Sequence, residues 1–373
     1  MRLVEAAATL GLLLGTHAKP CRGAAASDLD ILAGQHVIYS FPTSSTPPAE
    51  LVNLTSAGLV GGVILFGVNV DANTAAAMDT LRRAYAASPA PALLKKTTGE
   101  AGAIKFFVST DQEGGQVRRM KNDEPKLSAK QIGAAADPAA AGKAAGEGAA
   151  ATLRKFNNNV NLAPVLGVYR AAGDFLDYYG RSFGNTSQAV VAAAVPFLTA
   201  QQAAGVAATA KHFPGLGAAS HDANTDERPV TLDLSLEEIR RVDEAPYVAA
   251  IAAGVQLVMP SWAVYPALDA ARPAGLSGKW LREELRGRLG FQGVTVSDAM
   301  EAGSLSAFGG AAETATLAAE AGMDLLLASA RNVTQGEEIR KALVSGVSSG
   351  RLSRAQFDEA TKRIAALRSR LWA

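Results

Sequence analysis

The sequence predicts an α/β fold, a single (β/α)8 barrel of the TIM type, from three observations. Eight short apolar, β-rich runs recur along the chain, and helical patterns separate them. Most of the runs are uninterrupted, which is typical of parallel strands buried on both faces. Alternation repeated this often favours a closed barrel over an open doubly wound sheet, the alternative fold. The runs cover residues 36–41, 62–66, 106–110, 159–163, 206–211, 256–261, 294–297 and 324–328.

The segments between the runs show the patterns of amphipathic helices. The stretch 234–254 opens with a capping serine and an acidic first turn, and the Ala-rich stretch 129–156 is helical in pattern. The tail, 353–371, is expected to form a closing helix, with apolar residues on one face. Two further stretches, 87–103 and 170–186, are expected to be inserted loops.

Composition and charge exclude several classes of protein. The hydrophobic fraction of 48% and the charged fraction of 19% indicate a globular chain. The formal net charge is +1 and no basic tract is present, so nucleic-acid binding has no support. The single cysteine, Cys21, excludes an internal disulfide framework and a thiolate metal cluster. The sequence leaves the oligomeric state open, and a monomer is compatible with it.

The first residues are typical of a secretory signal. Arg2 precedes an apolar run over residues 3–14, and small residues follow the run. The run is too short to span a bilayer. We therefore expect residues 1–26 to be a signal peptide or flexible leader, and residues 27–373 to form the barrel domain of a secreted protein. If the leader is not a signal, a cytoplasmic location is expected.

Polar side chains gather where several of the predicted strands end. The third run ends in Asp111-Gln112-Glu113-Gly114-Gly115, and Arg119 follows shortly after. Paired glycines indicate a tight turn close to a ligand, and Asp111 and Arg119 are able to exchange hydrogen bonds with ligand hydroxyls. Taken alone, this cluster is better interpreted as a surface loop whose charges pair with one another.

The fifth and seventh runs end in two further clusters. Lys211 and His212 close the fifth run, where a cation and an imidazole are costly to bury unless they line a polar site. Taken alone, His212 is more often a structural histidine. Asp298 follows the seventh run, and a carboxylate at the end of a barrel strand can attack an anomeric carbon. Spacing alone equally allows Asp298 to cap a following helix.

Five motifs, in one order along the chain, resemble those of family 3 glycoside hydrolases and in particular the single-domain β-N-acetylhexosaminidase branch. The resemblance extends from about His36 to the last predicted strand. The motifs are Asp111-Gln112-Glu113-Gly114-Gly115 with Arg119, Asn161-Leu162-Ala163-Pro164-Val165, Gly180-Arg181-Ser182-Phe183, Lys211-His212-Phe213-Pro214-Gly215 and Ser297-Asp298.

The resemblance implies a retaining exo-β-glycosidase that releases terminal β-N-acetylglucosamine from a carbohydrate substrate. It implies that Asp298 is the nucleophile of a covalent glycosyl-enzyme intermediate, and that no metal or organic cofactor takes part. The residues that it implies for binding the sugar are Asp111, Arg119, Arg181, Lys211 and His212.

Two departures from the family pattern concern the proton donor and the substrate. Members of the branch usually carry an Asp-Ser-His triplet on the loop after Lys-His-Phe-Pro-Gly, with the histidine as general acid/base. This chain has Asp222-Ala223-Asn224 there. We therefore expect His221, oriented by the neighbouring Asp222, to be the acid/base, with Asp226 as the second candidate. The other departure is Gly167, where the family usually has an acid.

Three other functions stay open at this point. A non-catalytic sugar-binding barrel accounts for the missing family histidine, although not for the retention of Asp298. A β-glucosidase-like specificity keeps the mechanism and changes the sugar. A barrel enzyme that acts on phosphorylated metabolites needs a Gly-rich phosphate loop after the last two strands. Ser329-Ala330-Arg331-Asn332 is a poor match for such a loop.

Overall fold

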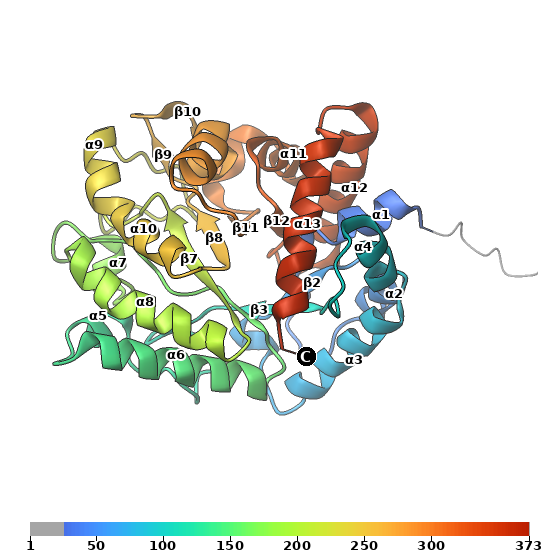
Figure 1. The fold of residues 1–373 in the computed structure, drawn as a ribbon, viewed down its shortest axis with the longest axis horizontal. Helices are drawn as coiled ribbons and strands as arrows, with labels where there is room; N and C mark the ends of the chain where they lie inside the picture. The colour runs from blue at the N-terminus through green and yellow to red at the C-terminus, as the bar shows by residue number, and fades with distance from the viewer. Residues whose placement is uncertain (1–25, 373) are drawn as a thin grey trace, which may run out of the picture.

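The computed structural model describes residues 26–372 and contains a closed barrel of eight parallel strands (Figure 1). The strands follow one another around the barrel in chain order. The predicted single (β/α)8 barrel is therefore confirmed, and each predicted run overlaps one strand. The barrel strands are β1 (Val37–Tyr39), β2 (Gly62–Ile64), β3 (Phe107–Thr110), β6 (Val160–Asn161), β7 (Ala207–Phe213), β8 (Leu257–Pro260), β11 (Val294–Ala299) and β12 (Leu325–Leu327).

Helices surround the barrel and connect its strands (Figure 1). The α-helices are α1 (Asp28–Gly34), α2 (Ala49–Ser56), α3 (Thr74–Ala87), α4 (Ala90–Thr98), α5 (Ala129–Gly133), α6 (Pro138–Lys155), α7 (Phe175–Tyr178), α8 (Ser187–Ala203), α9 (Leu236–Glu238), α10 (Ala245–Ala252), α11 (Ala311–Ala321), α12 (Val333–Ser349) and α13 (Arg354–Arg370). The 3₁₀ and π segments are η1 (Gly67–Asn69), η2 (Ile239–Asp243), η3 (Ala274–Leu276), η4 (Lys279–Arg288) and η5 (Gly303–Phe308). Two antiparallel pairs lie outside the barrel, namely β4 (Gln112–Gly114) with β5 (Val117–Arg118), and β9 (Val264–Tyr265) with β10 (Asp269–Pro273).

The prediction of a loop over residues 87–103 is wrong, because this stretch contains the helix α4. Pro89 is the N-cap of this helix, Pro91 lies in its first turn, and Gly99 ends it with a φ of 75°. Proline is tolerated in the first turn of a helix, and glycine adopts the left-handed conformation of a C-cap without strain. The residues that indicated a loop therefore mark the two ends of a helix. The other predicted loop, 170–186, contains only the short α7.

The barrel interior is filled by one apolar cluster that takes side chains from all eight strands and from α13. Ile364 and Leu367 of α13 belong to this cluster. The Arg368 carbonyl accepts a hydrogen bond from the N–H of Lys105, which lies just ahead of β3. The predicted closing helix therefore covers the amino ends of the strands, and the carboxyl ends are left for a functional site.

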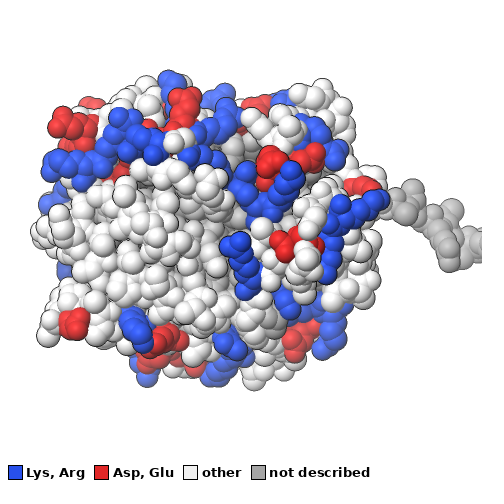
Figure 2. Space-filling model, in the orientation of Figure 1, with Lys and Arg blue, Asp and Glu red and all other residues white. Residues whose placement is uncertain are grey.

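The outer helices pack closely because small residues face one another. A Cβ atom added at Gly142 or at Gly146 of α6 would lie 2.2 Å from a carbonyl oxygen of α8, that of Ala193 or of Phe197. Figure 2 shows mostly uncharged side chains over α8 and α10, whereas charged side chains gather over α9. No helix within residues 26–372 has the length and apolar character needed to cross a membrane. Apart from residue 26, the predicted leader lies outside the described residues.

Asp324, immediately ahead of β12, connects α13 and η4 to the barrel. Its carboxylate accepts hydrogen bonds from Arg286 of η4 at 2.6 Å and from Arg363 of α13 at 2.7 Å. The N–H of Thr295 on β11 donates to the same carboxylate at 3.0 Å. The Asp324 side chain is only 1% exposed. Because the partners of this buried charge lie on several elements, loss of the charge is expected to disturb the relative placement of those elements.

We expect Asp324→Asn to lower the free energy of unfolding by about 3–5 kcal/mol, because two largely buried guanidinium groups lose their counter-charge. The matched control is Asp358→Asn, which removes an exposed ion pair with Arg354 on α13 and is expected to cost less than about 1 kcal/mol. Urea denaturation followed by circular dichroism measures both variants. Equal free energies of unfolding for the two variants would contradict the role given to Asp324.

Candidate active site

A cavity of about 850 Å³ lies at the carboxyl ends of the barrel strands. Phe66 follows β2, Asp111 follows β3, and Ser329 follows β12, whereas the other wall residues come from strand ends and connecting loops. The structure brings seven of the candidate site residues from the sequence into the lining of this cavity. They are Asp111, Arg119, Arg181, Lys211, His212, Asp226 and Asp298.

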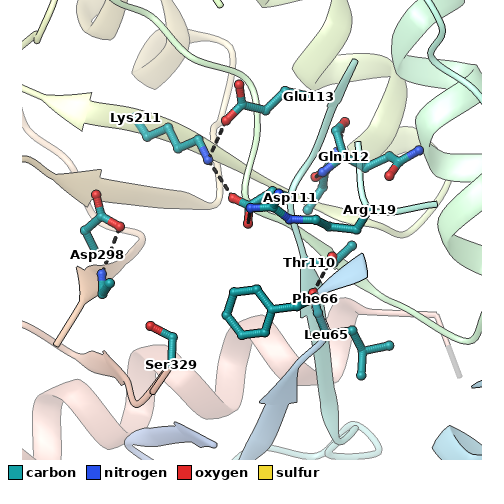
Figure 3. A network of polar contacts seen from close by, with 12 residues as sticks. Leu65, Phe66, Thr110, Asp111, Gln112, Glu113, Arg119, Lys211, Asp298 and Ser329 are labelled. Carbon is teal, nitrogen blue, oxygen red and sulfur yellow. Dashed lines mark hydrogen bonds and ion pairs between the residues drawn. The ribbon is translucent and has the colours of Figure 1, made fainter. Parts of the chain in front are cut away.

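Lys211, near the end of β7, joins two carboxylates (Figure 3). Its ammonium group lies 2.8 Å from Asp111 Oδ1 and 2.8 Å from Glu113 Oε1. Arg181 forms two hydrogen bonds to Glu113, at 2.8 and 2.9 Å. Arg119 donates to Asp111 Oδ2 at 3.1 Å. These five side chains form what we call the ion-pair cluster: Asp111, Glu113, Arg119, Arg181 and Lys211.

The ion-pair cluster keeps its two carboxylates and Lys211 charged. Burial would raise the pKa of Asp111, but Lys211 and Arg119 outweigh it and hold the pKa well below the usual range. Burial likewise opposes the ionisation of Glu113, whose pKa is nevertheless lowered to about 2 by Arg181 and Lys211. Burial would lower the pKa of Lys211, and the two carboxylates raise it. The donors and acceptors of the cluster are therefore fixed before a ligand arrives.

Glu113 is a member of the cluster that the sequence reasoning did not select. It occupies the middle of the β4 strand, and its side chain is 5% exposed. The sequence feature that could have identified Glu113 is its place in the Asp111–Gly115 motif, between an acid and two glycines. Gly114 and Gly115 have φ values of 114° and 55°, and a Cβ at Gly114 would lie 2.2 Å from the Leu127 carbonyl oxygen. Glycine is needed there for the turn that aims the carboxylates inward.

Gly167, a departure from the family pattern, is explained by close packing. A Cβ atom at this position would lie 2.2 Å from Cδ1 of Leu176. The Gly167 carbonyl accepts a hydrogen bond from the hydroxyl of Ser182 at 2.7 Å. Ser182 follows Arg181, so this contact fixes the loop that supplies Arg181 to the site. An acidic side chain at residue 167 therefore requires the Leu176 side chain to shift.

Asp298 lies near the end of β11, with its side chain 21% exposed. Its Oδ1 accepts a hydrogen bond from the N–H of Ala299 at 2.8 Å, and the Ala299 carbonyl accepts one from the indole of Trp262 at 2.9 Å. The strand runs through Asp298 and the next helical segment begins at Gly303, so the interpretation of Asp298 as a helix cap is wrong. The carboxylate is free to face the cavity.

Asp298 is surrounded by groups that favour its protonated form. Burial raises its pKa to about 7, and the negative charge of Asp226 adds to this effect, against the opposing influence of Lys211. His212 Nε2 lies 3.7 Å from Asp298 Oδ2, which is beyond hydrogen-bond distance. Burial, with the nearby Arg181 and Lys211, lowers the pKa of His212 well below its usual value, so its imidazole is neutral.

His221 and Asp222 form a pair outside the cavity lining. Nδ1 of His221 lies 2.7 Å from Asp222 Oδ1, and the two side chains are 48% and 80% exposed. The imidazole packs edge-on against the ring of Tyr178, with ring centroids 4.2 Å apart. The adjacent pairing expected from the sequence is therefore present, but neither residue is among those that line the cavity.

Asp226, four residues beyond Asp222, does line the cavity. Its carbonyl accepts a hydrogen bond from the N–H of Gly303 at 2.7 Å, and the carbonyl of Thr225 accepts one from Ser304 at 3.2 Å. These bonds tie the loop to the segment that follows β11, the strand of Asp298. Burial raises the pKa of Asp226, and Arg181 acts in the opposite direction.

Comparisons with known sequences agree with this geometry. The model of the glycosyl hydrolase family 3 N-terminal domain matches residues 31–367. A protein of Arthroderma benhamiae described as an uncharacterized secreted glycosyl hydrolase is 51% identical over 348 residues, which are 93% of this chain and 95% of that protein. A β-hexosaminidase of Tolumonas auensis is 35% identical over 272 residues, which are 72% of this chain and 75% of that protein.

Solved structures share the fold over most of the chain. A family 3 β-N-acetylglucosaminidase from Paenibacillus has a TM-score of 0.82 at 32% identity, and the match covers 92% of this chain but only 63% of that one. A β-N-acetylhexosaminidase from Beutenbergia cavernae has a TM-score of 0.76 at 29% identity, with 92% and 99% covered. On the extent of the family match and the identity to these relatives, the chain belongs to glycoside hydrolase family 3 and is a glycosidase similar to β-N-acetylglucosaminidases.

Proposed function

We propose that this glycosidase releases terminal β-N-acetylglucosamine with retention of configuration, through a covalent intermediate on Asp298. The observation that carries the proposal is the presence of two carboxyl groups, Asp298 and Asp226, in the wall of the cavity that the ion-pair cluster borders. A retaining glycosidase needs one carboxylate as nucleophile and a second group as acid and base. The names of the similar proteins support the choice of sugar.

The ion-pair cluster is suited to hold the sugar. Asp111 is kept ionised and accepts hydrogen bonds from hydroxyl groups, whereas Arg119 and Arg181 donate them. Hydrogen bonds to charged groups are about twice as strong as those between neutral groups. Because the charges are already paired within the protein, the cluster orients an uncharged sugar without needing charge on the ligand. Orientation of the anomeric carbon against the nucleophile lowers the entropic part of the barrier.

Asp298 is suited to attack because its backbone is fixed while its carboxylate borders the cavity. In the first step its oxygen forms a bond to the anomeric carbon as the bond to the leaving oxygen breaks. In the second step water displaces the carboxylate. The neutral His212 beside it leaves the negative charge of the ionised carboxylate uncompensated, which favours attack on a carbon that gains positive character.

Asp226 supplies the acid and the base in this proposal, in preference to His221 with Asp222. Asp226 lines the cavity, whereas His221 and Asp222 do not. A carboxyl group must keep its proton near neutral pH to act as an acid, and the raised pKa of Asp226, which lies in the cavity wall and also contacts solvent, is a shift in that direction. The same group then removes a proton from the attacking water.

We expect Asp298→Asn to lower hydrolysis of 4-nitrophenyl β-N-acetylglucosaminide by roughly 10³-fold or more, because the nucleophile is lost. Circular dichroism checks that the variant is folded. A panel of 4-nitrophenyl glycosides that includes the β-glucoside tests the sugar. Activity restricted to the β-glucoside would favour the β-glucosidase-like alternative, and a wild-type protein inactive on every glycoside would favour a sugar-binding barrel.

The acid/base role is tested with leaving groups of different basicity. We expect Asp226→Asn to slow the hydrolysis of chitobiose by roughly 10²–10⁴-fold, because its leaving oxygen needs a proton. The nitrophenyl substrate is expected to be affected far less in its first step, and added azide to restore turnover, because azide needs no base. His221→Ala serves as the comparison and is expected to cause small losses on both substrates. If His221→Ala instead slows chitobiose far more than the nitrophenyl substrate, and Asp226→Asn causes only small losses, the acid/base role belongs to His221.

The two carboxyls also predict a pH dependence. The reactive form has Asp298 ionised and Asp226 protonated, so the two carboxyls share one proton when the enzyme is active. We expect kcat/KM for chitobiose to fall at low pH, where both carboxyls are protonated, and at high pH, where both are ionised. Asp226→Asn removes one partner of the pair, so the fall at high pH is expected to disappear. Stopped assays across pH measure both profiles. A fall at high pH that persists in Asp226→Asn would show that Asp226 does not hold the shared proton.

A further inference from the structure

The cavity extends past the ion-pair cluster to a group of side chains that the proposed reaction does not use. We call Phe66, Lys121 and Arg331 the basic rim; all three line the cavity. The Cζ atom of Arg331 lies 4.7 Å from the centroid of the Phe66 ring, and the Cζ atom of Arg119 lies 6.0 Å from it. Phe66 therefore contacts both the cluster and the rim, and Figure 3 shows its ring directed into the space near Asp298 and Ser329.

The volume of the cavity leaves space for more than the sugar that is cleaved off. Pockets for ligands of drug size range over about 300–1,000 Å³, and about 850 Å³ lies near the top of that range. A single N-acetylated sugar ring is smaller than such a ligand. The remaining space has to take the group on the other side of the scissile bond, the aglycone, if the proposed function holds.

Arg331 is held in an unfavourable backbone conformation at this rim. Its φ of 59° lies in the left-handed region, which residues other than glycine rarely adopt. The hydroxyl of Ser40 fixes it by accepting a hydrogen bond from the Arg331 N–H at 2.7 Å. Asn332 then caps α12, with its side chain accepting from the N–H of Gln335. Strained residues persist where the surroundings determine them, often at ligand sites.

Neither cation of the rim, Arg331 or Lys121, takes part in an ion pair within residues 26–372, in contrast to Arg119, Arg181 and Lys211 of the cluster. Glu301 also lines the cavity, and it keeps its negative charge because its two oxygens accept hydrogen bonds from the neutral groups Ser329 Oγ at 2.7 Å and Gln335 Nε2 at 3.2 Å. The two cations of the rim outnumber this carboxylate, and Arg331 lies against an aromatic ring.

We propose that the basic rim is the aglycone subsite and selects an aglycone that carries a carboxylate next to an apolar or ring surface. The inference rests on the proposed function, because it places the aglycone relative to Asp298. The Phe66 ring packs against the apolar part of the aglycone, and Arg331 and Lys121 bind its negative charge. The sugar itself stays with the ion-pair cluster, where every charge already has a partner.

The test uses two glycosides that differ only in charge, the β-N-acetylglucosaminides of 4-carboxy-2-nitrophenol and 4-carbamoyl-2-nitrophenol. We expect wild-type kcat/KM to favour the carboxylate over the carboxamide. Arg331→Gln is expected to lower this preference by about tenfold, as loss of one charge-assisted contact predicts. Arg331→Lys keeps the charge and is expected to retain most of the preference. About 1 M NaCl is expected to reduce it, because the screening length falls to about 3 Å.

The control is Arg354→Gln, which removes a cation that pairs with Asp358 on α13 and does not line the cavity. Its preference is expected to equal that of the wild type. The proposal is overturned if the wild type shows no preference for the carboxylate. It is also overturned if Arg331→Gln lowers kcat/KM equally for both glycosides, because the role is then structural.

A separate measurement distinguishes this inference from the proposed function. If the wild type hydrolyses neither glycoside, the proposed function fails, and calorimetric titration with the same two intact glycosides still tests the rim. Tighter binding of the carboxylate that is lost in Arg331→Gln supports the subsite without catalysis. Equal affinity for the two glycosides rejects it.

Discussion

The buried ammonium group of Lys211 determines how three neighbouring strands of the barrel end. It is 3% exposed and contacts Asp111 and Glu113 from the segment after β3, whereas Arg181 reaches Glu113 from the loop after β6. Transfer of a charge from water into a protein costs several kcal/mol unless partners compensate it. The chain therefore keeps Lys211 buried only while the ends of β3, β6 and β7 stay in this arrangement. The side of the cavity that the ion-pair cluster forms is in this way part of the barrel and not an addition to it.

The pairing within the cluster also defines the electrostatics on the other side of the cavity. Because Lys211 is engaged by two carboxylates, its positive charge only partly offsets the burial that raises the pKa of Asp298. Asp226 adds a second carboxyl with a raised pKa. The cavity thus combines a side with permanent, paired charges and a side with two carboxyls that titrate together. Under the proposed function, the first arrangement suits the binding of a neutral sugar, and the second suits proton transfer near neutral pH.

The sequence contained enough to predict the barrel and several of the polar side chains that line the cavity. Buried parallel strands leave uninterrupted apolar runs, and barrel geometry places the polar residues after these runs at one end. That reasoning located Asp111, Lys211 and Asp298. It did not locate α4, because proline and glycine mark loops and helix ends alike. It ranked His221 ahead of Asp226, because adjacency of a histidine and an acid is visible in a sequence, whereas which of these residues borders the cavity depends on the folded loop.

Asn224 stands where the family pattern has its histidine, and its side chain holds the loop that carries Asp226. Its Oδ1 accepts a hydrogen bond from the N–H of Asp226 at 3.0 Å, and its Nδ2 donates to Glu227 at 2.9 Å. The residue at the histidine position therefore shapes the turn that carries Asp226, and Gly303 fixes the carbonyl of the same residue. Histidine has a pKa near neutrality without help from its surroundings, whereas an aspartate needs a raised pKa to keep its proton. Under the proposed function the loop has to hold Asp226 at the cavity wall, and the hydrogen bonds with Asn224 and Gly303 fix the backbone of this residue there.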